Sequence, residues 1–196
     1  MTSWKCRLPV WALAWVITWY SPLFAETYYV SPTGLDTAVG SQQAPWGTIQ
    51  HAADTVSPGD TVIVWAGEYD ETITMSRGGS AAAPVVFRAE PLQGAKCGGF
   101  RVEADHLTID GFHIEADAVT QIGVRINGQH FVTVSNCFIE ECPRGGVDAS
   151  GPSLADLSSN ITVSGNTFFH NGYWGVHVVG SSMTIAHNEI SHTVQH

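Results

Sequence analysis

The feature that most constrains this chain is a loose repeat in its second half. Four segments place a threonine between two apolar residues, followed by a short polar stretch and a further apolar residue: HLTIDGFHIEA at 106, FVTVSNCFIEE at 131, NITVSGNTFFH at 160 and SMTIAHNEISH at 182. Successive strand side chains point to opposite faces, so the apolar pair faces inwards and the threonine outwards. A second pattern, glycine followed by alternating residues, recurs as IGVRI, GGVDA and WGVHV. The predicted repeat unit is therefore strand, turn, strand, turn.

The distance between copies narrows the fold class. Successive copies are 25, 29 and 22 residues apart, which is the spacing of solenoid repeats. The strands are short and are joined by glycine, asparagine, aspartate and serine turns with no helical segment between them. This favours a parallel β-helix over leucine-rich or helical repeats. Because each coil can bury its inner face only against a neighbour, loose repetition that keeps inner apolarity is enough to specify the stack.

The chain divides into three predicted parts. Residues 1–25 read as a signal peptide, and residues 26–60 hold a short strand, a loop and a capping helix. In that helix, GTIQHAADTV, apolar residues recur at helical spacing after Thr48, a suitable N-cap. Residues 61–196 form the coils of the β-helix, with no linker between domains. The chain stops after NEISHTVQH, one strand into a coil and without a cap, so we expect it to be the C-terminally truncated, N-terminal part of a longer protein.

The first 25 residues have the pattern of a secretory signal. Lys5 and Arg7 precede an apolar run that Pro9 and Pro22 bracket, and this run is too short to span a membrane. Cleavage after Ala25 would release a secreted protein, extracellular or periplasmic and with no membrane attachment. An uncleaved anchor is the alternative.

Charge and cysteine content limit the partners. Without residues 1–25, six basic residues face eighteen acidic ones, which disfavours nucleic acid and anionic membranes as partners. Such a surface also repels an acidic polysaccharide unless a cation intervenes, and calcium, which takes several oxygen ligands, is the natural one.

The cysteines after residue 25 are three in number: Cys97, Cys137 and Cys142. An odd number excludes a complete set of disulfide bonds. Cys137 and Cys142 either close a small loop or are buried apolar residues.

The opening of the chain resembles a known family. Residues 26–70, which include YYVSPTGLD and APWGTIQHAADTVSPGDTVIVWAGEYD, are similar to the start of secreted right-handed parallel β-helix proteins related to pectate, alginate and chondroitin lyases. The later coils resemble the generic parallel β-helix repeat. The resemblance implies an all-β, right-handed parallel β-helix and a polysaccharide partner. The resemblance is specific for the fold but not for the activity, because such openings recur in β-helix proteins with many substrates.

Outward residues at equivalent positions should stack one per coil, about 4.8 Å apart. In the glycine-containing strands this puts Arg125, Asp148 and His177 in one column. A cation, a carboxylate and an imidazole in a row would bind a uronate or supply acid and base. The alternative is a surface ladder of charges that pair with one another. Trp174 is a candidate sugar platform if exposed, and otherwise a packing residue.

A second column offers metal ligands. Glu141, His170 and His192 follow equivalent apolar residues, and Asp148 is a further candidate ligand; an exposed polar corner is the alternative. A further set of carboxylates could hold calcium on a neighbouring coil: Asp110, Glu115 and Asp117. The signal is weak, because the sequence around them lacks the DxDxDG pattern of a calcium-binding loop.

The resemblance implies a β-elimination lyase as the leading enzyme class. Such an enzyme abstracts the proton next to the uronate carboxylate with a lysine or arginine, while calcium or another cation neutralises that carboxylate. Lys96 matches no catalytic motif; Arg125 is better placed, and Arg144 lies in the turn before GGVDA. In a lyase we therefore expect the base to lie beyond residue 196. A glycoside hydrolase is less favoured, because the aspartate-pair and Gly-His-Gly motifs of polygalacturonases are absent.

The prediction is thus a secreted β-helix protein that acts on or binds polysaccharide, with a calcium-assisted lyase of uronic-acid polymers as the leading enzyme. The alternative is a non-catalytic carbohydrate-binding or adhesive β-helix. The oligomeric state is left open.

Overall fold

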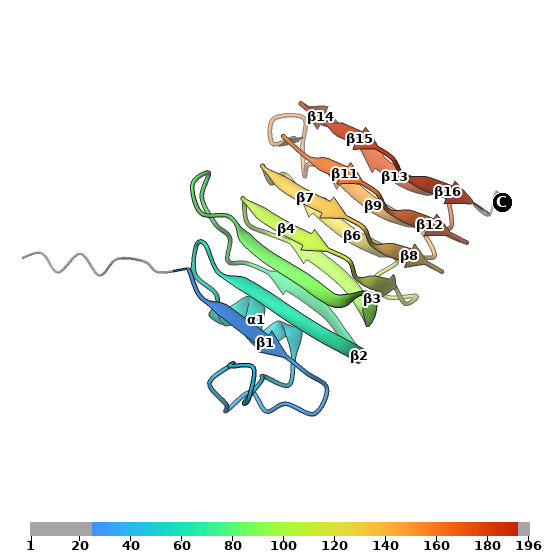
Figure 1. The fold of residues 1–196 in the computed structure, drawn as a ribbon. Helices are drawn as coiled ribbons and strands as arrows, with labels where there is room; N and C mark the ends of the chain where they lie inside the picture. The colour runs from blue at the N-terminus through green and yellow to red at the C-terminus, as the bar shows by residue number, and fades with distance from the viewer. Residues whose placement is uncertain (1–24, 192–196) are drawn as a thin grey trace, which may run out of the picture.

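The structure is a computed structural model in which residues 25–191 are described (Figure 1). The predicted signal peptide, apart from Ala25, and His192 lie outside these residues. In the part described, no helix is long and apolar enough to cross a membrane. Figure 1 shows parallel strands stacked coil upon coil, from β1 at one end of the stack to β15 and β16 at the other.

One short helix and sixteen strands make up the described chain. In chain order they are β1 (Thr27–Val30), α1 (Ile49–Thr55), β2 (Thr61–Met75), β3 (Val85–Val102), β4 (Leu107–Asp110), β5 (His113–Glu115), β6 (Ile122–Asn127), β7 (Val132–Ser135), β8 (Phe138–Glu140), β9 (Gly145–Ser150), β10 (Ser158–Ser159), β11 (Thr162–Ser164), β12 (Thr167–Phe169), β13 (Trp174–Val178), β14 (Gly180–Ser181), β15 (Thr184–Ala186) and β16 (Glu189–Ser191).

Each full coil contributes to three sheets. The long strand β3 bends around its coil and pairs in turn with β4, β5 and β6. We call the three sides the first sheet (with β4, β7, β11 and β15), the second sheet (with β5, β8, β12 and β16) and the third sheet (with β6, β9 and β13). The predicted two-strand unit is therefore wrong. The apolar residue after each polar turn is the centre of a three-residue strand, which is too short for alternation to reveal it.

The predicted register of the first sheet is confirmed. Thr133 pairs with Thr108 on one side and Thr162 on the other, and Thr162 pairs with Thr184. The inward neighbours on the complete inner coils are almost wholly buried: Leu107, Ile109, Val132, Val134, Ile161 and Val163. Stacked apolar columns thus form a continuous core along the helix axis.

Two third-sheet strands, β6 and β9, have as their second residue a glycine in close packing. A Cβ added to Gly123 would lie 2.8 Å from Ile139, and one added to Gly146 would lie 2.4 Å from Phe168. Both neighbours are the central apolar residues of second-sheet strands. The recurrent glycine therefore makes room for the core where the second and third sheets meet.

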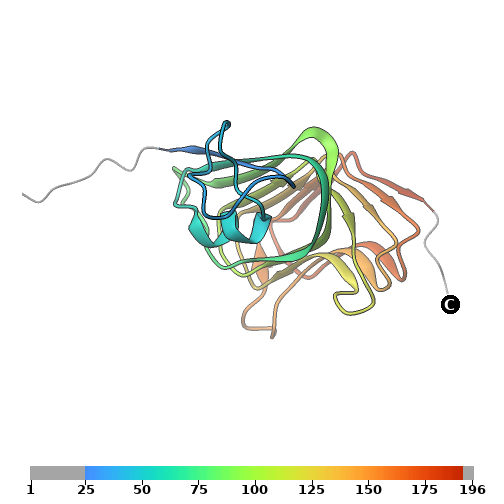
Figure 2. The ribbon, with the colours of Figure 1, turned by 90° about the horizontal axis from the view of Figure 1, so that it is seen from below.

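The helix predicted to cap the first coil is present. The Thr48 side chain accepts a hydrogen bond from the His51 N–H, and Ile49, Ala52 and Ala53 are buried. The Glu71 carboxylate of β2 accepts from the N–H groups of Ile49 and Gln50 at 2.7 and 3.0 Å. Figure 2, seen from the end that holds β1, shows α1 lying against the first coil.

The three cysteines of the described residues are free and buried, so the small disulfide loop considered for Cys137 and Cys142 is not formed. Each of these two cysteines is aligned with an asparagine of the next coil. The Cys137 N–H donates to Asn166 Oδ1, and the Cys142 N–H donates to Asn171 Oδ1. Asparagine side chains thus satisfy the backbone of the preceding coil at two corners.

Candidate functional site

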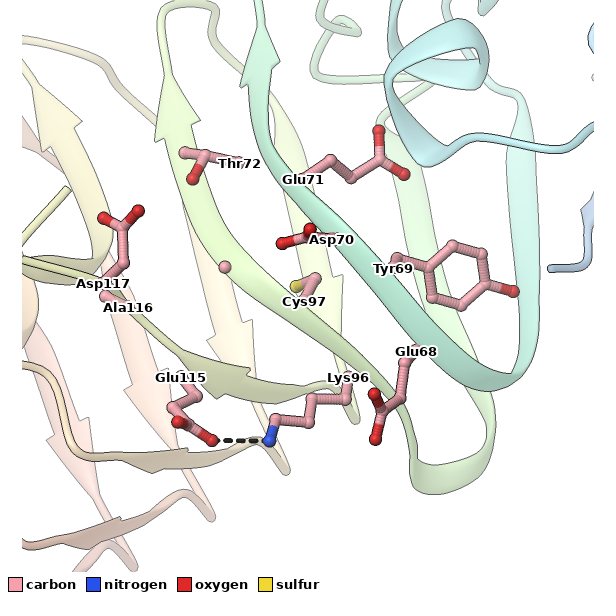
Figure 3. Close-up of a pocket in the computed structure, with 11 residues that line it drawn as sticks. Glu68, Tyr69, Asp70, Glu71, Thr72, Lys96, Cys97, Glu115, Ala116 and Asp117 are labelled. Carbon is pink, nitrogen blue, oxygen red and sulfur yellow. Dashed lines mark ion pairs between the residues drawn. The ribbon is translucent and has the colours of Figure 1, made fainter. Parts of the chain in front are cut away.

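A hollow of about 480 Å³ opens at the corner where the second sheet turns towards the third (Figure 3). Three successive coils line it with residues 68–72 of β2, residues 96–98 of β3 and residues 115–117, which begin at the end of β5. Four of the lining carboxylates are Glu68, Asp70, Glu115 and Asp117. Lys96 is the one lysine or arginine in the lining. We call this feature the acidic hollow.

Lys96 forms an ion pair across the hollow. Its Nζ lies 2.6 Å from Glu115 Oε2, and both side chains are partly exposed. The hydrogen bond to Glu115 raises the pKa of Lys96 against the opposing effect of burial, and the charges of Glu115, Glu68 and Glu140 act in the same direction as the hydrogen bond. The amine is therefore a protonated cation at neutral pH. This suits it to binding a carboxylate and makes it a poor proton-abstracting base.

Three other residues in the lining have structural roles. Figure 3 shows Glu71 and Tyr69 directed away from the Lys96–Glu115 pair. Glu71 caps α1; burial raises its pKa, while the hydrogen bonds from Ile49 and Gln50 oppose that change. The Tyr69 hydroxyl donates to the Trp65 carbonyl at 2.9 Å, and burial raises the pKa of the Cys97 thiol. Glu71 and Tyr69 therefore stabilise the first coil through hydrogen bonds to α1 and within β2.

Beside the hollow, three ligand side chains converge on the outer surface of the second sheet. His113 Nε2 lies 2.9 Å from Glu140 Oε1, and the parallel register pairs Glu115 with Glu140. One ligand atom from each of His113, Glu115 and Glu140 lies within 4.8 Å of the others. His113 is the first residue of strand β5. In the sequence, HIE and FIE follow equivalent polar turns, but three residues carry too little alternation to predict this cluster.

This cluster does not fit calcium by itself. Calcium takes six to eight oxygen ligands. Here two residues offer carboxylate oxygens and the third offers an imidazole nitrogen, while Lys96 already occupies one carboxylate. The predicted calcium therefore does not gain a complete set of protein ligands at this place.

Aromatic rings continue the same surface on the next coils. Phe138 pairs in register with His113, and the two rings meet edge to face with their centroids 5.1 Å apart. Phe169 pairs with Glu140, and its ring is stacked with Phe138 at 6.5 Å. We call this surface the second-sheet face. It consists of Glu68, Lys96, His113, Glu115, Phe138, Glu140 and Phe169.

The column predicted on the third sheet exists in register. Arg125 pairs with Asp148, and Asp148 pairs with His177. His177 Nδ1 lies 3.1 Å from Asp148 Oδ1, which agrees with a ladder of mutually paired charges. Its role in binding stays a prediction. Asp148 is not part of the three-ligand cluster found among the described residues.

The other predicted candidates lie elsewhere. Glu141 and His170 are neighbours, with 3.1 Å between Oε1 and Nδ1, and both are exposed at a corner. Neither belongs to the three-ligand cluster found among the described residues, and because His192 lies outside those residues, the predicted metal column stays a prediction. Trp174 is half-buried. The Arg144 guanidinium lies 5.8 Å from its ring centroid, and its indole Nε1 is buried without a hydrogen-bond partner. These contacts agree with a packing role, and sugar binding by Trp174 stays a prediction.

Comparisons with known proteins agree with this fold. Residues 28–180 match the family model described as Pel9A-like, right handed beta helix region. The chain is similar to the uncharacterized protein YwoF of Bacillus subtilis (strain 168), with 27% identity over 140 residues, which are 70% of this chain and 27% of YwoF. It is also similar to pectate lyase PEL9 of Emericella nidulans, with 40% identity over 78 residues, which are 38% of this chain and 19% of PEL9.

Among solved structures, an alginate lyase from Paenibacillus sp. FPU-7 superimposes with a TM-score of 0.64 at 15% identity, covering 85% of this chain and 58% of that one. This likeness concerns the fold. The chain spans only about a quarter of YwoF and a fifth of PEL9. Since the family model covers most of the chain, the chain belongs to the family of Pel9A-like right-handed β-helix regions.

Proposed function

We propose that this chain presents a polysaccharide-binding surface within a protein that acts on polysaccharide, and that the second-sheet face is that surface. The observation that carries the proposal is that two aromatic rings, Phe138 and Phe169, share the outer surface of the second sheet with the Lys96 cation, with His113 between Lys96 and Phe138. Aromatic rings pack against the apolar faces of sugar rings, and an ammonium group pairs with a uronate carboxylate. The Pel9A-like family and the pectate lyase among its relatives support the same substrate class.

The leading reaction for the whole protein is β-elimination in a uronic-acid polymer. That reaction needs positive charge at the uronate carboxylate and a base at the neighbouring carbon. Lys96, protonated beside Glu115, suits the first role, and the base is a different residue. Because carboxylates outnumber the cation in the acidic hollow, added calcium is expected to strengthen binding of an acidic polysaccharide by offsetting repulsion.

A non-catalytic carbohydrate-binding or adhesive protein is the alternative. It is favoured by the same hollow, in which the one lysine is held as a cation and is unsuited to proton abstraction. Under this alternative the second-sheet face binds polysaccharide and no product is released.

One pair of measurements tests the proposal and separates the two candidates. The full chain is run on gels containing polygalacturonate or alginate, with calcium or with EDTA, and the same mixtures are followed for the ultraviolet absorbance of an unsaturated product. We expect calcium-strengthened retardation that Phe138→Ala weakens roughly tenfold, equal to about 1.4 kcal/mol. The matched control is Phe131→Ala, because Phe131 is an exposed aromatic residue outside this surface.

The outcomes are distinct. Retardation with absorbance supports the lyase, and retardation alone supports the binding protein. Equal effects of Phe138→Ala and Phe131→Ala, or no retardation on either polymer, would contradict the second-sheet face as the binding surface.

We also propose that the protein is secreted after cleavage following Ala25. The support is the Lys5 and Arg7 cluster with the apolar run that follows it. N-terminal sequencing and the intact mass of the exported protein test this. A first residue other than Glu26, or retention in the cell, would contradict it.

A further inference from the structure

We propose that His113, Glu115 and Glu140 form a binding site for a divalent ion of the zinc class, one that prefers nitrogen and oxygen ligands together. The inference does not rest on polysaccharide binding. It follows from the convergence of an imidazole and two carboxylates on two neighbouring strands, β5 and β8, with ligand atoms within 4.8 Å of one another.

The geometry is close to what such an ion needs. Tetrahedral zinc with ligands at about 2.0–2.2 Å holds its ligand atoms roughly 3.4 Å from one another. His113 and Glu140 are already at 2.9 Å, so an ion entering between them requires only a slight opening. The Glu115 carboxylate must then move closer to the other two ligands. It can do so because its partly exposed side chain has several rotatable bonds.

The surroundings hold the ligands in place. The edge of the Phe138 ring contacts the His113 ring, with centroids 5.1 Å apart and planes at 62°, which limits rotation of the imidazole. The backbone pairing of Glu115 with Glu140 fixes the distance between the Cα atoms of these two residues. With three protein ligands, a fourth position stays open to solvent, as in zinc sites that bind a further ligand.

The donor set selects the ion. Two carboxylates and a neutral imidazole carry two negative charges, which a divalent ion neutralises. Calcium and magnesium prefer all-oxygen sites, whereas imidazole favours zinc and the later transition metals. A uronate-bridging calcium would not depend on His113, so the histidine is the residue that distinguishes the two ions.

Lys96 competes with the ion. Its Nζ lies 2.6 Å from Glu115 Oε2, so the ammonium and an ion compete for the negative charge of the same carboxylate. Removal of the competitor should therefore strengthen metal binding. A purely structural role for the cluster gives no reason for such a gain.

The test is direct metal binding by the full, untagged chain. After removal of metals with EDTA and dialysis, zinc chloride and calcium chloride are titrated separately in a calorimeter, and cobalt binding is followed by its absorption spectrum. We expect a zinc site that His113→Ala and Glu140→Gln each weaken by roughly tenfold or more, and that Lys96→Met strengthens by a few fold. His177→Ala is the matched control, since that histidine also pairs with a carboxylate but lies outside the three-ligand cluster.

Thermal melting confirms that each variant is folded, and Glu140→Gln, which keeps the shape of the side chain, decides the matter if His113→Ala does not fold. Zinc binding that is unchanged by Glu140→Gln overturns the proposal. So does a site that binds calcium more tightly than zinc, and so does a loss of zinc affinity in His177→Ala as large as that in His113→Ala.

Discussion

The outer surfaces of the second and third sheets are built from the same coils and the same parallel register, yet they hold their polar groups differently. On the third sheet, Arg125, Asp148 and His177 lie in one column, and the neighbouring outward pair, Asn127 and Ser150, is neutral. On the second sheet, His113 and Glu115 both point outwards from one strand and meet Phe138 and Glu140 on the next. One column allows charges to pair only along the stack, whereas two adjacent columns bring side chains together from two directions, which is what a site requires.

The largest effect is expected from removing part of the core that supports both surfaces. Phe168 of β12 is fully buried between the coils. Phe168→Ala should lower the free energy of unfolding by about 3–5 kcal/mol, through lost burial and the cavity left behind. Urea denaturation measures the change.

The control lies one residue further along the same strand. Phe169 points outwards and is only half-buried, so Phe169→Ala should cost about 1 kcal/mol. Equal losses for the two variants would mean that the assigned inward and outward faces of β12 are wrong, and with them the composition of the second-sheet face.

The next largest effect is expected at the corner that leads into the second sheet. Asn166 is buried; its Oδ1 accepts from the Cys137 N–H at 2.9 Å, and its Nδ2 donates to the Val134 carbonyl at 3.0 Å. Asn166→Ala removes both of these hydrogen bonds, leaves the Cys137 N–H without this acceptor, and should cost about 2–3 kcal/mol. Asn127→Ala, at an exposed asparagine of strand β6 with an ordinary extended backbone, is the control and should cost less than about 0.5 kcal/mol. Similar losses in thermal or urea unfolding would contradict the supporting role of Asn166.

Much of the fold could be predicted because its rules are local. The alternation of apolar residues around Thr108, Thr133 and Thr162 determines which side faces the core, and stacking brings equivalent residues into register. The third-sheet column was predictable for the same reason. The capping helix followed from Thr48 and helical spacing. These features depend on short segments and a constant repeat.

The second-sheet face was harder to predict because it depends on non-repeating residues. Lys96 lies in GAKCGGF, which shares no pattern with the later coils, and only the bending of β3 brings it beside Glu115. His113 and Glu140 lie in three-residue strands, which carry too little alternation to show which face these residues occupy. Convergence across two coils is a tertiary property, so residue types alone did not reveal the cluster.

A smaller effect is expected at Asp110 of strand β4, on the first sheet, whose side chain is only 11% exposed. Its contribution to stability can be compared with those of the charges on the second and third sheets. Burial raises the pKa of Asp110, but hydrogen bonds from Asn136, Ser135 and Arg88 outweigh it, and the net pKa lies below the usual 3.8. A lowered pKa stabilises the fold above about pH 4, and this contribution is lost as pH falls through the lowered value.

Asp110→Asn should therefore lower the free energy of unfolding by roughly 1 kcal/mol at pH 7, a modest value because Arg88 is 52% exposed. The difference from the unaltered protein should shrink as the pH falls from 5 towards 2. Urea denaturation at several pH values checks this. A difference that stays constant over that range would mean that the carboxylate charge does not stabilise the fold.

The smallest effect is expected from the third-sheet column, and it is the measurement that decides between the two surfaces. The double variant Asp148→Ala with His177→Ala removes the paired imidazole and carboxylate while leaving the second-sheet face intact. The His177 side chain is 46% exposed, and an exposed pair of this kind contributes about 0–1 kcal/mol to stability, so the fold should be retained. If the second-sheet face is the binding surface, retardation on a polysaccharide gel should change less than about twofold, well under the roughly tenfold loss expected for Phe138→Ala. A tenfold loss in the double variant, with Phe138→Ala unaffected, would move the binding surface to the Arg125, Asp148 and His177 column. One column of charges would then be sufficient for binding, and the convergence of two columns on the second sheet would serve the metal site alone.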